Sequence, residues 1–206
     1  MKNIINLLIK INITLVSLIL GIFDRIYQKK IIKILKKIFN NKIDIIFDVG
    51  AHRGEFTNLM LSNFVINKIH LFEPNPENFY FIKNKFKQEK IILDNYALGE
   101  KEEEKKFKIM RETSSSTFSE INKNTKYFKR KNLILNLGMN SEIFKEISIK
   151  IINGAKLIER EKINSIDLLK IDTEGHEYYV IKGFEGDISK IKVIFFEHHY
   201  DEMIIK

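Results

Sequence analysis

The chain of 206 residues contains no cysteine, no tryptophan and only two prolines. Without cysteine it can form no disulfide, no thiolate metal site and no cysteine nucleophile, and this fits a reducing, cytoplasmic setting. Abundant isoleucine, lysine, asparagine and phenylalanine beside so little proline are typical of an AT-rich coding sequence. With 44% hydrophobic and 30% charged residues, the composition is that of an ordinary globular protein with one sizeable core.

The net charge of +8 makes a nucleic-acid partner a hypothesis to consider. The positive charge is concentrated in separate blocks, at residues 25–42, 83–90 and 123–131, which are typical of solvated helix faces. No motif combines basic and aromatic residues in the manner of nucleic-acid binders. We therefore expect no nucleic-acid partner.

Residues 4–23 are apolar apart from a few polar positions. The uninterrupted part after Lys10 is short for a membrane span, which needs about 20 apolar residues. No small-x-small cleavage site follows, so the sequence does not indicate a removable signal peptide. A helix that lies in a membrane interface, or one that packs on the domain, is the better interpretation.

The next stretch, residues 25–39, predicts an amphipathic helix. Its apolar positions Ile31, Ile34, Leu35 and Ile38 recur at helical spacing against Lys29, Lys30, Lys33, Lys36 and Lys37. Two interpretations stay open: a helix on the anionic inner face of a membrane, or a first helix that covers the sheet. We therefore divide the chain into an N-terminal helical extension, residues 1–40, with peripheral membrane contact as one hypothesis, and a domain, residues 41–206.

The most informative motif runs from Ile45 to Thr57, where an apolar run ends in Asp48-x-Gly50 and Gly54 follows as a helical pattern opens. It predicts a buried strand followed by backbone that can approach a ligand closely. Such a pocket opens at the carboxyl end of the first strand in an open α/β sheet. The glycine spacing is not that of dinucleotide binders, and it suits S-adenosylmethionine better.

From Ile43 onward, strand and helix patterns alternate, which predicts an α/β fold with an open, mostly parallel sheet flanked by helices. Asn75 is the expected cap of a helix that starts at Pro76. Residues 99–160 break the alternation: we expect a solvated turn at 101–106, short strands at 107–110 and 147–152, and helix within 118–144. The expected strands of the main sheet are 43–49, 68–72, 91–97, 166–171 and 191–197, with helices at 55–63, at 76–86 and from 177.

Three acidic residues, Asp48, Glu73 and Asp172, follow or end successive strands, where open α/β sheets bind ligands. Glu73 lies 19 residues beyond Gly54, about where a carboxylate accepts hydrogen bonds from both ribose hydroxyls. The alternative is that Glu73 is only an acidic residue at the entry of the next helix.

A second cluster, Asp172, Glu174, His176 and Glu177, follows the strand at 166–171. Methylation of a hydroxyl requires removal of its proton, and neutral histidine suits this near pH 7. We predict His176 as the base and Asp172 as the group that orients the substrate or the methionine amino group. A surface-loop histidine remains the alternative for His176. Carboxylates at Asp172 and Glu174 are weak evidence for a metal, and we predict none.

Together these motifs resemble the FkbM family of S-adenosylmethionine-dependent methyltransferases. The resemblance rests on five stretches in order: 47–51, 72–76, 95–99, 169–177 and 196–197. It implies a Rossmann-like methyltransferase fold and methyl transfer to oxygen, often of a sugar or polyketide hydroxyl. It also implies that Asp48, Gly50 and Glu73 hold the cofactor, that Asn95 and Ala97 lie near the adenine, and that Asp172, Glu174 and His176 lie at the reacting centre. The whole predicted cofactor-binding set is Asp48, Gly50, Ala51, Gly54, Glu73, Asn75, Asn95, Ala97 and Asp172.

One departure from that family concerns the carboxyl terminus. Methyltransferases of this fold normally add a helix and an antiparallel strand pair after the fifth strand, whereas this sequence ends at Lys206. An exposed strand edge would favour pairing with a second copy, so a homodimer is a further hypothesis. We predict an S-adenosylmethionine-dependent O-methyltransferase that acts on a hydroxyl of a glycan or other small metabolite. The alternative is a catalytically impaired methyltransferase fold that serves as a membrane-surface or binding module.

Overall fold

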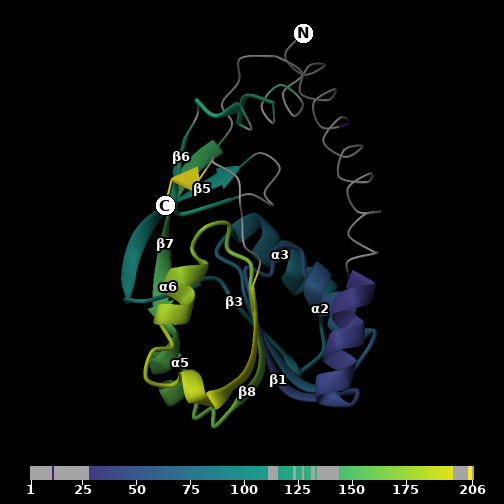
Figure 1. Ribbon diagram of the computed structural model, residues 1–206. Helices are drawn as coiled ribbons and strands as arrows, with labels where there is room; N and C mark the ends of the chain where they lie inside the picture. The colour runs from purple at the N-terminus through teal and green to yellow at the C-terminus, as the bar shows by residue number, and fades with distance from the viewer. Residues whose placement is uncertain are drawn as a thin grey trace.

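The computed structural model describes residues 11, 28–110, 116–122, 124–126, 128–130, 133, 144–196 and 204–205. Its centre is a five-stranded sheet with the strand order β3-β2-β1-β8-β9 (Figure 1). All four strand pairs of this sheet are parallel. The predicted open sheet flanked by helices is therefore confirmed. Its strands are β1 (Lys42–Val49), β2 (Val65–Phe72), β3 (Ile91–Asp94), β8 (Ile166–Ile171) and β9 (Ile191–Phe196).

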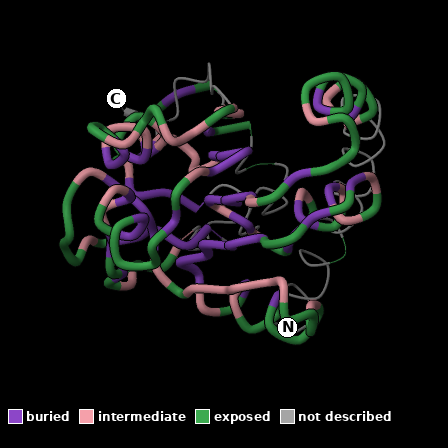
Figure 2. The backbone as a smooth tube through the Cα atoms, turned by 90° about the horizontal axis from the view of Figure 1, so that it is seen from below, coloured by how far each residue is buried: buried purple, intermediate pink, exposed green. Residues whose placement is uncertain are grey.

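Helices pack against the two faces of the sheet because neighbouring strand residues point to opposite sides. On β1, Ile46 belongs to one hydrophobic cluster and Phe47 to the other, and neither side chain is exposed. Figure 2 shows that the strands through the middle of the molecule are largely buried. The first cluster includes residues of the helix at 28–39, α2 (Glu55–Leu61) and α3 (Pro76–Lys85), and the second includes residues of α5 (Gly154–Arg160) and α6 (Glu177–Lys182).

Helix α3 begins as the sequence predicts. The Asn75 side chain accepts a hydrogen bond of 3.0 Å from the backbone N–H of Glu77, and Pro76 occupies the first helical position. A proline there loses no helical hydrogen bond, because the first N–H groups have no partner within the helix. The predicted cap is confirmed, and it fixes the direction in which the chain leaves β2.

The expected strand at 91–97 is wrong in one respect, because it is two strands in two sheets. Strand β3 ends at Asp94, and β4 (Ala97–Gly99) joins a second sheet of order β4-β7-β5, with β5 (Glu103–Met110) and β7 (Phe144–Asn153). The charged run at 101–106 is not only a turn, since β5 already begins at Glu103 and pairs antiparallel with β7. Charged side chains are tolerated there because that end of β5 is exposed and faces opposite charges, as in the Lys106–Glu146 ion pair at 3.7 Å.

The region expected to be helical, residues 118–144, is mixed where the structure describes it. Strand β6 (Glu120–Ile121) pairs with β10 (Ile204–Ile205) in a small antiparallel sheet, whereas residues 126 and 128–130 are helical. In the described ranges β9 pairs only with β8. The predicted apolar segment at 4–23 lies outside the described residues except for Ile11, as do residues 111–115, 134–143 and 197–203.

The helix at 28–39 covers the sheet, which was one of the two interpretations of its pattern. Ile32 and Leu35 are buried against β1, β2 and α2, within the first hydrophobic cluster. Across the described ranges, no helix is long and apolar enough to cross a membrane.

His70 on β2 makes the stability of the fold dependent on pH. Its ring stacks on Phe47 with centroids 5.0 Å apart, and its Nε2 has no hydrogen-bond partner in the described structure. Burial, helped by the positive charge of Lys68, lowers the pKa of His70 to about 4 from an ordinary 6.5. Because the folded pKa lies below the unfolded one, stability is lost as the pH falls from 6.5 toward 4.

We therefore expect His70→Leu to flatten the pH dependence of stability. Between pH 7 and pH 4, wild type should lose about 3 kcal/mol more unfolding free energy than the variant, because it alone must charge this buried ring. Urea denaturation across this pH range measures it. Ile46→Val, on the other face of β1, is the control: it should cost stability at every pH without changing the slope. Equal slopes for His70→Leu and wild type would contradict the assignment.

Candidate functional site

Three strand ends meet at one edge of the main sheet. Val49 of β1 pairs with Phe72 of β2 and with Ile171 of β8. The next residue on each strand is therefore Gly50, Glu73 or Asp172, side by side. A cavity that opens to solvent lies at this edge, lined by Val49, Gly50, His52, Phe72, Glu73, Pro74, Asn78, Ala97, Leu98, Phe107, Ser116, Phe118, Asp172, Thr173, Glu174 and His176.

Gly50 brings two loops closer together than any other residue could. Its φ of +74° is a left-handed conformation, and a Cβ built there would lie 1.9 Å from the carbonyl oxygen of Asp172. The backbone N–H of Gly50 donates to the carbonyl of Phe72, and that of Asp172 donates to the carbonyl of Val49, both at 3.0 Å. The floor of the cavity is thus formed by backbone that is hydrogen-bonded between neighbouring strands on both sides of β1.

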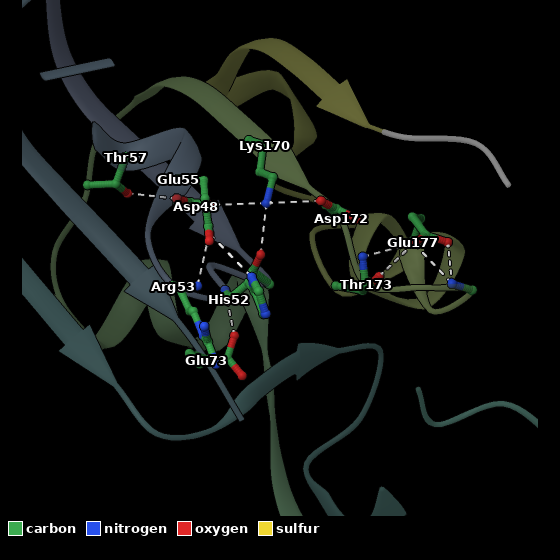
Figure 3. Close-up of polar contacts among 12 residues, drawn as sticks. Asp48, His52, Arg53, Glu55, Thr57, Glu73, Lys170, Asp172, Thr173 and Glu177 are labelled. Carbon is green, nitrogen blue, oxygen red and sulfur yellow. Dashed lines mark hydrogen bonds and ion pairs between the residues drawn. The ribbon is translucent and has the colours of Figure 1, made fainter. Parts of the chain in front are cut away.

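A buried lysine lies beneath this floor. Lys170 Nζ is 3.1 Å from Asp48 Oδ1, 3.6 Å from Asp172 Oδ2 and 2.8 Å from the carbonyl oxygen of Gly50 (Figure 3). Asp48 is fully buried, and its other oxygen accepts a 2.7 Å hydrogen bond from Thr57 of α2. Asp48 and Lys170 are direct neighbours in the register of β1 and β8, so the two strands place the opposite charges together.

The charge state of Lys170 follows from these neighbours. Burial on its own lowers the pKa of Lys170, but the carboxylates of Asp48 and Asp172 outweigh it and raise the pKa above its ordinary value. Lys170 therefore stays positive. It offsets one of the two negative charges of Asp48 and Asp172 and ties the Gly50 carbonyl in place.

Glu73 is a buried carboxylate in the cavity wall. Its two oxygens accept hydrogen bonds from the backbone N–H groups of His52, at 2.7 Å, and Asn75, at 2.8 Å. Burial raises the pKa of Glu73 to about 7, against the lowering effect of these two hydrogen bonds. The Asn95 side chain donates to the carbonyl oxygens of Glu73 and Pro74 and so holds this loop. Each carboxylate oxygen keeps a second lone pair for a ligand.

The loop after β8 is organised by Glu177. Its carboxylate accepts hydrogen bonds from the N–H and hydroxyl of Thr173, at 2.9 and 3.1 Å, and from the N–H of Gly175 at 3.1 Å. Glu174 and Gly175 both have positive φ, so the chain turns sharply here. The turn directs His176 toward the cavity, and Glu177 is a positioning residue of this loop.

His176 is buried, which rules out the surface-loop alternative. Only 4% of the residue is exposed, and its ring lies 4.9 Å from Phe118 and 5.0 Å from Tyr179, centroid to centroid. Burial, with the nearby positive charge of Lys105, lowers the pKa of His176 to about 4. Its Nε2 has no hydrogen-bond partner in the described structure. His176 is therefore neutral at pH 7; the residue lines the cavity, and its Nε2 is buried beside Gly99 of β4.

The structure brings part of the predicted site together. Gly50, Glu73, Ala97, Asp172, Glu174 and His176 line the cavity. The remaining predicted residues take supporting positions next to it: Asp48 in the buried ion pair, Ala51 hydrogen-bonded to Phe72, Gly54 against the Phe86 ring, Asn75 as helix cap and Asn95 bracing the Glu73 loop. Their part in cofactor binding stays a prediction. Within the described ranges, no group of three or more acidic or histidine side chains gathers as a metal site would require.

Sequence reasoning assigned no role to Lys170 or to the aromatic wall. The sequence did contain a signal for Lys170. The strand Ile166–Ile171 is buried along its whole length, and a lysine inside such a strand must have buried partners. The wall residues Phe107 and Phe118 lie on β5 and just before β6, and Thr117 donates a 2.6 Å hydrogen bond to the carbonyl of Glu174. No sequence pattern joined these segments to the distant loop at 172–177.

The chain resembles a known protein family over most of its length. A family model described as the methyltransferase FkbM domain matches residues 48–204. No curated protein matches the chain. A crystal structure of methyltransferase FkbM from Methylobacillus flagellatus KT is similar, with 14% sequence identity and a TM-score of 0.45. The match covers 72% of this chain but 30% of that one, so this chain spans less than a third of the length of that protein.

We expect Gly50→Ala to be strongly destabilising. Its methyl group cannot be placed without separating the β1 and β8 loops, and the left-handed backbone adds strain, so about 3 kcal/mol or more should be lost. Gly186→Ala is the matched control, because Gly186 has a φ of +97° but nothing within 4 Å of the new Cβ. It should lose only the strain, about 1 kcal/mol. Equal losses in denaturant titrations would refute the close-approach account.

Replacing Lys170 should expose the cost of the buried carboxylate. We expect Lys170→Met to lose about 3 kcal/mol or more of unfolding free energy at pH 7, since Asp48 is left charged and buried. The double variant Lys170→Met/Asp48→Asn should recover much of this loss, as no uncompensated charge remains at position 48. Chemical denaturation measures both. A double variant no more stable than Lys170→Met would show that charge is not the cause.

Proposed function

Because the chain belongs to the FkbM methyltransferase family, we propose that it is an S-adenosylmethionine-dependent O-methyltransferase that acts on a hydroxyl of a glycan or other small metabolite. The observation that carries the proposal is the cavity in which Gly50, Glu73 and His176 meet. It combines a close backbone approach, a buried carboxylate and a neutral base, which are the parts that cofactor binding and hydroxyl activation need.

The residues present fit the cofactor. Any Cβ at position 50 would fill the cradle beside Asp172, and the Glu73 carboxylate has lone pairs left to accept from two ribose hydroxyls. The Asp172 carboxylate, one-third exposed at the cavity, would hold the methionine amino group. When bound, S-adenosylmethionine supplies an electrophilic methyl group.

The charge balance of the site favours a cationic ligand. Asp48 and Asp172 carry two negative charges against the single positive charge of Lys170, and Glu73 adds a further negative charge above its pKa. S-adenosylmethionine, with its sulfonium and ammonium groups, carries net positive charge at neutral pH. Because Asp48 and Glu73 are buried, their attraction for a cation is screened less than it would be in water.

His176 would take the proton of the acceptor hydroxyl on its imidazole ring. Its low pKa keeps the imidazole neutral at physiological pH, so a ring nitrogen is able to accept. Phe107 and Phe118 line the same cavity, and the Phe118 ring packs against the imidazole, so these side chains would exclude water and hold the acceptor near the base. The rate would come from this positioning and from proton removal.

Affinity for S-adenosylmethionine should rise with pH through the pKa of Glu73, about 7. The ribose hydroxyls donate to the ionised carboxylate, which is mostly protonated below that pH, so we expect binding about tenfold weaker at pH 6 than at pH 8. Isothermal titration calorimetry on the full chain at several pH values measures this.

Glu73→Gln is the control for this pH dependence. It should bind about tenfold more weakly at pH 8, and only the titration of the ligand itself should remain in its pH dependence. Absence of binding by wild type, or an unchanged pH dependence in the variant, would overturn the assignment of Glu73 and with it the cofactor site.

A further inference from the structure

We propose that the outer side of the helix at residues 28–39 binds the surface of an anionic membrane. This inference is independent of methyl transfer, because it rests on a surface outside the cavity. The helix lies along one face of the sheet, beside β1 and α2 (Figure 1).

The helix carries charge of one sign only. Among its twelve residues are five lysines, Lys29, Lys30, Lys33, Lys36 and Lys37, and no aspartate or glutamate. All five side chains are exposed. The helix therefore carries five positive charges, whereas the net charge of the whole chain is +8. A helix that only covered a sheet would need polar residues on its outer side, but not residues of a single charge sign.

The same helix has more apolar surface than the sheet can cover. Ile32 and Leu35 are 8% and 4% exposed and form the packed side. Ile34 and Ile38, one turn apart on another side, remain 58% and 53% exposed. At 100° per residue, Lys30 and Lys37 lie next to this isoleucine pair on the side away from Leu35, so aliphatic and positive groups share one outward surface.

An anionic lipid surface is the partner whose chemistry matches both features. Lysines beside an anionic membrane each strengthen binding by about fivefold, while exposed aliphatic side chains enter the boundary between headgroups and acyl chains. A nucleic acid would attract the lysines but would leave the isoleucines in water. A single exposed isoleucine needs no explanation, but a pair at one-turn spacing beside a row of lysines does.

The primary test is co-sedimentation of the full chain with vesicles. We expect binding to phosphatidylcholine vesicles that contain phosphatidylglycerol, weakened by 0.5 M salt, and little binding to phosphatidylcholine alone. The variant Ile34→Ser/Ile38→Ser and the variant Lys30→Gln/Lys33→Gln/Lys37→Gln should each bind at least about tenfold more weakly. Because all five positions are exposed, circular dichroism should show that both variants fold.

Matched controls separate this surface from general charge and hydrophobicity. Ile188→Ser removes an isoleucine that is 43% exposed on the short helix η1 (Ile188–Lys190), and Lys101→Gln/Lys150→Gln/Lys162→Gln makes the same change in charge at exposed positions elsewhere. Both controls should bind vesicles nearly as wild type does. Equal loss in the two lysine triples would mean that net charge alone attracts the protein, and would overturn the proposal.

Insertion can be read directly because the chain has no tryptophan. Ile34→Trp should shift its fluorescence emission to the blue on anionic vesicles, whereas Ile188→Trp should not. No shift at position 34, no binding by wild type, or full binding by the two helix variants would each refute the proposal. Binding of RNA with no binding to vesicles would assign the lysines to a nucleic acid instead.

Discussion

The buried ion pair between Lys170 and Asp48 is the interaction on which the candidate site depends. A lysine and an aspartate inside a core are costly unless each compensates the other, so they favour the one register of β1 and β8 that places them side by side. That register aligns the ends of the two strands, and β2 follows through the pairing of Val49 with Phe72. Gly50, Glu73 and Asp172 then meet at one edge because the strands beneath them are fixed.

Burial then acts on the site in two opposite ways. It raises the pKa of Glu73 to about 7, because a carboxylate loses its charge more readily in a dry environment, and it lowers the pKa of His176 to about 4. Glu73 therefore lowers the free energy of unfolding as the pH rises from 4.5 toward 7. His176 lowers it as the pH falls from 6.5 toward 4. The site carries this cost, and it gains a carboxylate and an imidazole whose charge states are set for ligand binding and proton removal.

Local signals predicted the parts of the fold that depend on local chemistry. The apolar run before Asp48, the cap at Asn75 and the strand before Asp172 each appear in a few neighbouring residues, and the structure confirms these elements. The second sheet was harder, because β5 begins in a charged run whose partner β7 lies about 40 residues away. For the same reason the aromatic wall was missed: Phe118 reaches His176 only through tertiary packing. The burial of His176 follows from that wall and from no pattern around residue 176.

The most direct test of the central claim, methyl transfer to a hydroxyl assisted by His176, uses S-adenosylmethionine with a tritiated methyl group and a panel of glycans and hydroxylated metabolites. The account predicts alkali-stable label in an acceptor with wild type, as an O-methyl ether requires. It predicts that His176→Gln still binds the cofactor but transfers label at least about a hundredfold more slowly. Label that alkali releases as methanol, or equal transfer by His176→Gln, would contradict the account.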